Sequence, residues 1–244
     1  MEQKHIRTLS PVAYIRSDFP SKFGIPRQSG MVNLPSKILF TKEFRNGDCL
    51  RGIEQFTHLW LIWGFSENFD HDWTPTVRPP RLGGNSRTGI FACRSPFRPN
   101  PLGLSCVRLE KYEPSTPEGP VLLVSGADLM DQTPIYDIKP YIPFTDSHPE
   151  ASGSFSTKAL THQLSVRCPD VLLSVIPEEK RQPLLDCLAL DPRPSYQKDP
   201  DRIYGMAFGK WDIHFKVNGL SLVVTDISEN VVPDTIFSCA DEIR

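Results

Sequence analysis

The sequence predicts a mainly β fold for the first 150 residues and a small α+β region after them. Short apolar runs bounded by turn residues recur along this first part. Proline is frequent, with 24 in the chain, which leaves little room for long helices. No G-x-G-x-x-G or G-x-x-x-x-G-K-[ST] pattern is present, so the sequence predicts neither a Rossmann nor a P-loop site. Several short strands in succession favour a closed or sandwiched β structure.

Five apolar runs define the expected strands of the first region. Each is rich in Val, Ile, Leu or aromatic residues and is short enough for one strand. The runs are Lys37–Phe40, Leu59–Phe65, Gly89–Cys93, Ser105–Leu109 and Val121–Val124. Trp60 and Trp63 lie in the most apolar of them and are expected in the core.

The second region begins after residues 147–157, a small and polar stretch that we interpret as a linker. Residues 1–148 and 158–244 are therefore the two expected domains. Leucine spacing predicts a helix over Glu178–Leu190, with Pro183 limiting its start. Residues 212–227 predict a hairpin in which Asn218-Gly219 supplies both positive-φ positions of a type I′ turn.

Composition excludes several classes of protein. With 39% hydrophobic and 23% charged residues, the 244-residue chain has an ordinary globular composition. No apolar run reaches the roughly 18 residues of a membrane span, and the N-terminus lacks the apolar core of a signal peptide. We therefore expect a cytoplasmic protein without membrane contact. The six cysteines form no C-x-x-C pair, so no metal site is expected.

One window of the chain carries charge of a single sign. Between Trp73 and Leu109 there is no Asp, Glu or Lys, whereas the whole chain has a formal net charge of -2. The window holds six arginines, namely Arg78, Arg81, Arg87, Arg94, Arg98 and Arg108. Guanidinium groups recognise phosphate and carboxylate in a bidentate manner, and prolines in the same window favour rigid loops. The window predicts an anion-binding face; the alternative is a surface loop whose arginines pair with acids elsewhere.

Four segments combine such side chains with rigid backbone. They are Phe23–Gln28, residues 78–87 with Gly83-Gly84, Arg94–Ser105 with Asn100 between two prolines, and Asp128–Tyr141. The alternative to a functional role is a plain turn for the first segment and a surface loop for the second. The aspartates of the fourth segment suit a cationic or hydroxyl-rich ligand or a proton, or else belong to turn chemistry. Tyr136 and Tyr141 are expected in a polar loop, where they could stack on a base.

Five ordered motifs resemble the TrmO family with its TsaA-like domain. They are Pro26-Arg-Gln28, VRPPRLGGNSR (77–87), GIFACRSPFRPNPLGLS (89–105), DLMDQTPIYDIKPYIPF (128–144) and DPRPSY (191–196). The chain departs from the family pattern at Gln132, where the usual motif is D-G-T-P, and at Leu102, where it is P-N-P-I-G. The resemblance implies a tRNA (adenine-37-N6)-methyltransferase acting on N6-threonylcarbamoyladenosine.

The resemblance also implies a β-barrel that binds S-adenosylmethionine without a Rossmann sheet, at or near a homodimer interface. The implied cofactor contacts are Pro26, Arg27, Gln28, Ser66, Glu67, Arg94, Leu104, Asp128, Leu129, Met130 and Asp131. The N6 nucleophile must lose a proton, and we expect Asp131 or Asp137 to accept it.

The remaining arginines are expected to bind RNA. Arg78, Arg81, Arg87 and Arg98 would face anticodon-loop phosphates or the threonyl carboxylate, and Arg193 would add a contact from the second domain. Two other interpretations remain open from the residues alone. One is a non-catalytic RNA-binding module, for which the arginine window would suffice. The other is a protein-interaction module that docks through its proline-rich loops.

Overall fold

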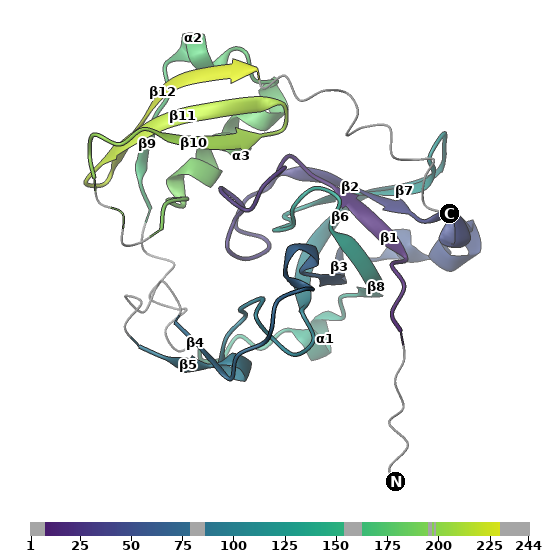
Figure 1. The fold of residues 1–244 in the computed structure, drawn as a ribbon. Helices are drawn as coiled ribbons and strands as arrows, with labels where there is room; N and C mark the ends of the chain where they lie inside the picture. The colour runs from purple at the N-terminus through teal and green to yellow at the C-terminus, as the bar shows by residue number, and fades with distance from the viewer. Residues whose placement is uncertain (1–7, 79–85, 154–162, 195–196, 198, 230–244) are drawn as a thin grey trace.

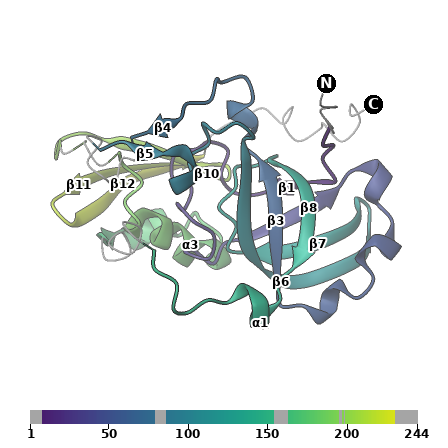
Figure 2. The same ribbon diagram turned by 90° about the horizontal axis from the view of Figure 1, so that it is seen from below.

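The computed structural model describes residues 8–78, 86–153, 163–194, 197 and 199–229. Six antiparallel strands form a closed barrel in the order β1-β2-β7-β6-β3-β8 (Figures 1 and 2). Their bounds are β1 Ala13–Arg16, β2 Pro35–Phe40, β3 His58–Gly64, β6 Leu102–Thr116, β7 Gly119–Ser125 and β8 Pro134–Pro140. The predicted mainly β fold is confirmed, and the strands form a barrel.

Alternation of buried and exposed positions explains these strands. Along β2 the burial pattern alternates over most of its length, and Ile38 and Phe40 point into the barrel core. The same period puts Leu59, Leu61 and Trp63 of β3 inside and Trp60 outside. Because side chains alternate across a strand, one register serves both the core and the outer surface.

Four of the five predicted strands are confirmed, and the fifth is wrong. The Gly89–Cys93 run forms a short 3-10 helix, η6 (Ile90–Ala92), after β5 (Thr88–Gly89), which pairs only with β4 (Thr76–Val77) among the described residues. Ile90 in this run is buried, but Phe91 is 81% exposed, so the apolar residues do not all face the interior. Apolar character alone therefore misassigned it.

The polar loop expected around Tyr136 is also wrong, because these residues form β8. This strand pairs with β1 through Pro134 and Ile135 and with β3 along most of its length. Tyr141 packs against the Trp60 ring at 5.7 Å between centroids instead of standing free. The β8 sequence lacks a strand signature, since its outward positions carry Asp137 and Lys139.

Short helical turns lie between the barrel strands, and one more follows the last of them. They are η1 (Lys42–Phe44), η2 (Gly47–Leu50), η3 (Ile53–Gln55), η4 (Ser66–Asn68) and α1 (Pro143–Asp146). Within the described part of the chain, no helix is both long enough and apolar enough to cross a membrane.

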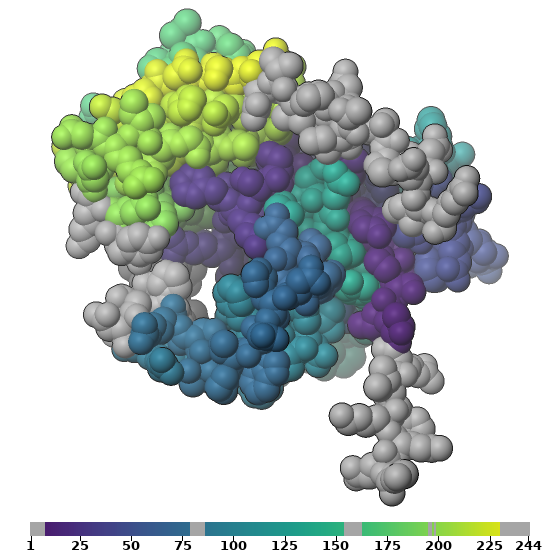
Figure 3. All heavy atoms as spheres, in the orientation of Figure 1, coloured from purple at the N-terminus to yellow at the C-terminus, as the bar shows by residue number. Residues whose placement is uncertain are grey.

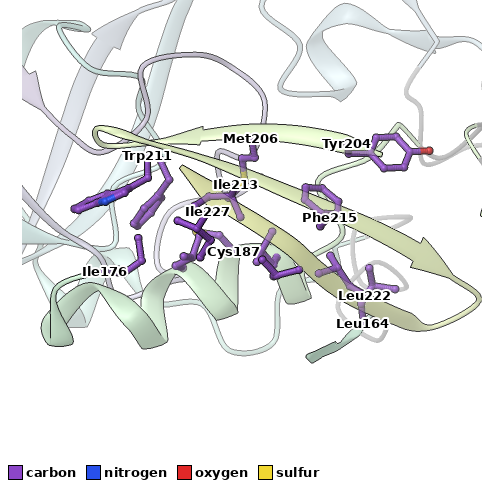
Figure 4. Packing of buried hydrophobic residues seen from close by; sticks show 14 of the residues in the cluster. Leu164, Ile176, Cys187, Tyr204, Met206, Trp211, Ile213, Phe215, Leu222 and Ile227 are labelled. Atoms are coloured by element: carbon purple, nitrogen blue, oxygen red, sulfur yellow. The ribbon is translucent and has the colours of Figure 1, made fainter. Parts of the chain in front are cut away.

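The C-terminal region is a four-stranded sheet packed against one helix. Its strand order is β10 (Tyr204–Phe208), β11 (Trp211–Asn218), β12 (Ser221–Glu229) and β9 (Ser165–Arg167), with β9 parallel to β12. Helix α3 (Glu178–Ala189) lies across one face of the sheet, with apolar side chains between them (Figure 4), and α2 (Asp170–Leu173) precedes it.

Two details of this region differ from the sequence prediction. Asn218 pairs with Ser221, so the hairpin loop is Gly219-Leu220, and only Gly219 has a positive φ, of 58°. One positive φ at the first loop position is typical of a type II′ turn and not of type I′. Pro183 lies inside α3, where it is buried beside Leu184, and does not limit the start of the helix.

The connection between β1 and β2, residues 17–34, links the two regions (Figure 3). Phe19, Val32 and Leu34 belong to the same buried cluster as the C-terminal sheet and α3. At the same junction, Lys180 Nζ lies 2.8 Å from Asp18 Oδ1, and the Gly209 amide donates to the Asp18 carbonyl. The C-terminal region therefore holds the connection against the barrel.

Gln132 occupies a left-handed backbone conformation, with a φ of 63°. Its amide donates to the Ile15 carbonyl at 2.8 Å, which ties the β7–β8 connection to β1. Non-glycine residues adopt this conformation at a cost on the order of 1 kcal/mol. The backbone shape that suits the family's usual glycine is thus retained although glycine is absent.

The strain at Gln132 predicts that Gln132→Gly stabilises the protein. We expect the free energy of unfolding to rise by about 0.5–1 kcal/mol in chemical denaturation, since glycine removes the steric cost. Gln55→Gly is the matched control, because Gln55 lies in η3 without a positive φ. It should be neutral or destabilising, and equal effects of the two variants would contradict the strain argument.

Candidate functional site

A cavity of about 400 Å³ lies where three connections of the barrel meet. Its walls come from the β1–β2 connection, the end of β3 with η4, the loop before β6, and the β7–β8 connection. The lining residues are Lys22, Ile25, Pro26, Trp63, Gly64, Phe65, Ser66, Glu67, Asn68, Pro96, Phe97, Asp128, Met130 and Thr133. Mostly apolar walls with a few polar groups are typical of a small-molecule site.

Asp128 is the carboxylate most deeply set in this cavity. It follows β7 and accepts a hydrogen bond from the Ser105 hydroxyl of β6. Ser105 is fully buried and in turn accepts a bond from Trp63 Nε1 at 2.9 Å. Trp63 packs over Gly103, where any β-carbon would collide with the indole. Side chains of β3 and β6 thus hold the Asp128 carboxylate in place through hydrogen bonds.

Burial raises the pKa of Asp128 above its ordinary value. The Ser105 hydrogen bond, backbone hydrogen bonds and the Arg94 guanidinium act in the opposite direction and lower it. A partly desolvated carboxylate supported by oriented donors is suited to receive a cation, because few waters compete for it.

An ion pair stands at another part of the cavity wall. Lys22 Nζ lies 2.8 Å from Glu67 Oε2 and donates to Asn68 Oδ1 at 3.2 Å. Both charged side chains are about half exposed, so this pair is accessible from solvent. Lys22, Asn68, Phe97 and Thr133 line the cavity although the sequence did not single them out. Lys22 and Asn68 lie outside the four segments that the sequence singled out, so only the fold could reveal them, whereas Phe97 and Thr133 lie within two of those segments.

The structure brings together part of the predicted cofactor set. Pro26, Ser66, Glu67, Asp128 and Met130 line the cavity. Gln28 and Arg94 lie beside each other, since Arg94 donates to Gln28 Oε1. Arg27 donates to the carbonyl of Asp191 in the C-terminal region at 3.1 Å. The C-terminal region therefore also holds this arginine.

Three predicted contacts are directed elsewhere. Leu129 is 1% exposed and packs in the barrel core, so it does not line the cavity. Leu104 is 50% exposed on β6, and its side chain does not line the cavity. Asp131 accepts from Arg16 Nε at 3.1 Å and from the Ser17 amide at 3.0 Å, which joins β1 to the β7–β8 connection.

Neither predicted proton acceptor lines the cavity. Asp131 is engaged with β1, as described above, and Asp137 lies 2.8 Å from Lys139 Nζ on β8. Sequence proximity grouped these aspartates with Asp128. In the barrel the β8 pairing directs Asp137 away, because it stands opposite Ile62 of β3.

The predicted RNA-binding arginines differ in availability. Arg78 and Arg87 are exposed beside β4 and β5, and Arg81 lies outside the described residues. Arg98 donates to the carbonyls of Cys93 and Ser95, at 3.0 and 3.2 Å, and so braces its own loop. Arg193 has a side chain only 10% exposed and binds both carboxylate oxygens of Asp191. Geometry therefore assigns Arg98 and Arg193 structural contacts.

Two family models match this chain. That of the tRNA-methyltransferase O N-terminal domain matches residues 14–147, and that of the TrmO C-terminal domain matches residues 163–230. The chain belongs to the TrmO family. The resemblance drawn from the five motifs is confirmed.

Individual relatives of the TrmO family cover nearly all of the chain. The tRNA (adenine(37)-N6)-methyltransferase of Escherichia coli (strain K12) is 39% identical over 213 residues, 84% of this chain and 89% of that protein. A putative S-adenosylmethionine-dependent methyltransferase, RcsF, of Pseudomonas aeruginosa is 39% identical over 217 residues, 85% and 91% of the two chains. A crystal structure of TrmO from P. aeruginosa has a TM-score of 0.75 at 32% identity, covering 94% of this chain and 100% of that one.

The raised pKa of Asp128 predicts that Asp128→Asn stabilises the ligand-free protein at neutral pH. The folded state binds the Asp128 proton more tightly than the unfolded chain does. That contribution to stability is therefore present at low pH and lost as the pH rises through the raised pKa. Thermal unfolding should show a higher Tm for the variant at pH 7 and no gain below about pH 4. Asp137→Asn, at an exposed ion pair, is the control; a gain of the same size there would contradict the burial argument.

The buried pairing of Arg193 predicts that Arg193→Ala lowers the free energy of unfolding by about 2 kcal/mol or more, because the buried Asp191 carboxylate loses its ion pair with that guanidinium. Arg202→Ala is the control, since Arg202 is exposed and lies over the same Tyr204 ring. We expect less than about 0.5 kcal/mol there. Urea denaturation of both variants measures the difference, and a neutral Arg193→Ala would contradict the structural role.

Proposed function

We propose that this protein is an S-adenosylmethionine-dependent methyltransferase that methylates N6 of adenosine 37 in tRNA, with N6-threonylcarbamoyladenosine as its substrate. Membership of the TrmO family and the names of its relatives support the reaction. The observation that carries the proposal is the cavity with Asp128 on its wall, formed by segments that match the family's motifs.

The residues of the cavity fit S-adenosylmethionine. This molecule combines an adenosine, a positively charged sulfur, an ammonium and a carboxylate. Trp63, Phe65 and Phe97 offer apolar and aromatic surface for the adenine, and the supported carboxylate of Asp128 suits a cationic group. Lys22 and the paired Gln28 and Arg94 provide donors for a carboxylate or an adenine edge.

When bound, the cofactor supplies an electrophilic methyl group. The protein's residues then position and protect the reactants. Holding the N6 nucleophile in line with the methyl group is expected to lower the barrier by several kcal/mol, because the reactants no longer have to find each other. The N6 proton needs an acceptor near the cavity. Glu67 lines it and is half exposed, so it replaces Asp131 and Asp137 as the proposed carboxylate, alongside solvent.

The tRNA contact is proposed for the surface around β4 and β5. Arg78 and Arg87 are exposed there and suit anticodon-loop phosphates. Trp73 and Phe91, 53% and 81% exposed, lie in the same part of the chain and suit stacking with unpaired bases. We place the protein in the cytoplasm, where tRNA is its substrate.

We also propose a homodimer. Leu104 belongs to the implied cofactor contacts, yet it is half exposed on β6 and does not line its own cavity. A partner subunit docked on this face would bury Leu104 and bring it to the partner's cofactor. Sedimentation that gives only a monomer would contradict this arrangement.

Methyl transfer from labelled S-adenosylmethionine to tRNA tests the proposed function. We expect label on tRNA that carries the threonylcarbamoyl group and not on tRNA that lacks it. Equal labelling of both would contradict the substrate. A protein that binds tRNA without binding the cofactor would instead be a non-catalytic RNA-binding module, and one that binds neither would favour protein docking.

The proposed tRNA surface predicts that Arg78→Ala and Arg87→Ala weaken tRNA binding and flatten its salt dependence. Each lost phosphate contact should reduce the slope of log K against log salt concentration by about 0.7–0.9. Arg51→Ala is the control, because Arg51 is exposed but pairs with Asp48 on the barrel. Filter binding across a salt series measures all three, and equal slopes would contradict this surface.

A further inference from the structure

The support behind Asp128 has a fixed hydrogen-bond direction. An indole N–H can only donate, so the Ser105 hydroxyl must accept from Trp63 Nε1. The single proton of that hydroxyl is then free to point at Asp128 Oδ1. Because Ser105 is fully buried and Trp63 is 8% exposed, water does not offer the hydroxyl another partner. The two hydrogen bonds therefore run in one direction, from Trp63 through Ser105 to the Asp128 carboxylate, which accepts the last one.

The backbone geometry keeps this chain in place. Trp63 of β3 stands opposite Gly103 of β6, and Ser105 follows two residues later on the same face of β6. The missing side chain at Gly103 leaves the space that the indole occupies. Phe65 also packs edge-on against Trp63, at 4.4 Å between ring centroids.

We propose that Ser105, oriented by Trp63, is a positioning residue that keeps Asp128 ionised and aimed into the cavity to receive a cationic group of the cofactor. This inference rests on the proposed function, because it takes S-adenosylmethionine as the ligand. Trp63 and Ser105 were not among the implied cofactor contacts; Ser105 lies in the cavity's supporting wall and does not line it.

The charges around Asp128 explain why a hydroxyl is needed there. Burial disfavours the ionised carboxylate, and the Ser105 hydrogen bond is the largest influence in the opposite direction. Arg94 acts on Asp128 from the loop before β6. The other charged groups of the cavity, Lys22 and Glu67, pair with each other. Without Ser105, the carboxylate would bind its proton at a higher pH.

Calorimetric titration of S-adenosylmethionine into Ser105→Ala tests the proposal. We expect the Kd to increase about tenfold at neutral pH, as for the loss of a hydrogen bond to a charged group. The increase should be larger at lower pH, since Asp128 is then protonated more readily. Trp63→Phe, which removes only the donor and part of the ring, should shift the Kd in the same direction.

The barrel itself provides matched controls. Ser125 is also buried and also donates to a carboxylate, Glu110, outside the cavity. Trp60 also lies on β3 and donates to a carboxylate, Asp146, at 2.9 Å. Ser125→Ala and Trp60→Phe should therefore leave the Kd and its pH dependence unchanged. Ser105→Thr, which keeps the hydroxyl, should bind more tightly than Ser105→Ala.

Parallel titration with S-adenosylhomocysteine, which lacks the sulfonium charge, identifies the cation. If Ser105→Ala loses affinity for S-adenosylmethionine alone, Asp128 binds the sulfonium. If it loses affinity equally for both ligands, Asp128 binds the ammonium. Either result supports the proposal. A folded Ser105→Ala protein with the Kd and pH profile of Ser125→Ala would overturn it. Wild-type protein that binds neither ligand would instead contradict the proposed function.

Discussion

The pairing of β8 with both β1 and β3 is the constraint on which the rest of the structure depends. It closes the barrel, although the β8 sequence carries polar residues at its outward positions. Closure pairs the backbone N–H and C=O groups that the edge strands of an open sheet would expose. It also brings the β7–β8 connection against β1, where Asp131 binds Arg16 and the Ser17 amide. The cavity exists because this connection, the end of β3 and the β1–β2 connection meet at one place.

The C-terminal region contributes to that place without lining the cavity. It buries Phe19, Val32 and Leu34 of the β1–β2 connection in its own core, so one wall of the cavity is anchored from outside the barrel. Arg27 also contacts the C-terminal region, because it donates to the carbonyl of Asp191, whose side chain pairs with Arg193. The family's late motif therefore acts on the first one through direct contact. Through these contacts the C-terminal sheet is joined directly to one wall of the cavity.

Asp128 illustrates a conflict between stability and binding. Burial makes its charge costly in the ligand-free protein, and a cation entering the cavity would remove that cost. Functional sites commonly retain such unfavourable groups because ligand binding offsets them. The Trp63–Ser105 support lowers the cost only in part, which leaves the carboxylate ready for a positively charged partner. Gln132 is a second local cost in free energy, since a non-glycine residue adopts the left-handed backbone conformation there.

The sequence by itself determined the mainly β class, four barrel strands, the C-terminal helix and hairpin, and the family, because short periodic apolar runs and long ordered motifs are local signals. It also identified Pro26, Ser66, Glu67, Asp128 and Met130 as candidates that the fold brings to one cavity. Only the tertiary structure decided that β8 is a strand, that Asp137 faces away and that Arg193 is buried. The physical reason is that strand pairing and burial depend on neighbours distant in the chain. Side-chain direction in a barrel is set by the register with those neighbours, and no spacing within a single segment contains that information.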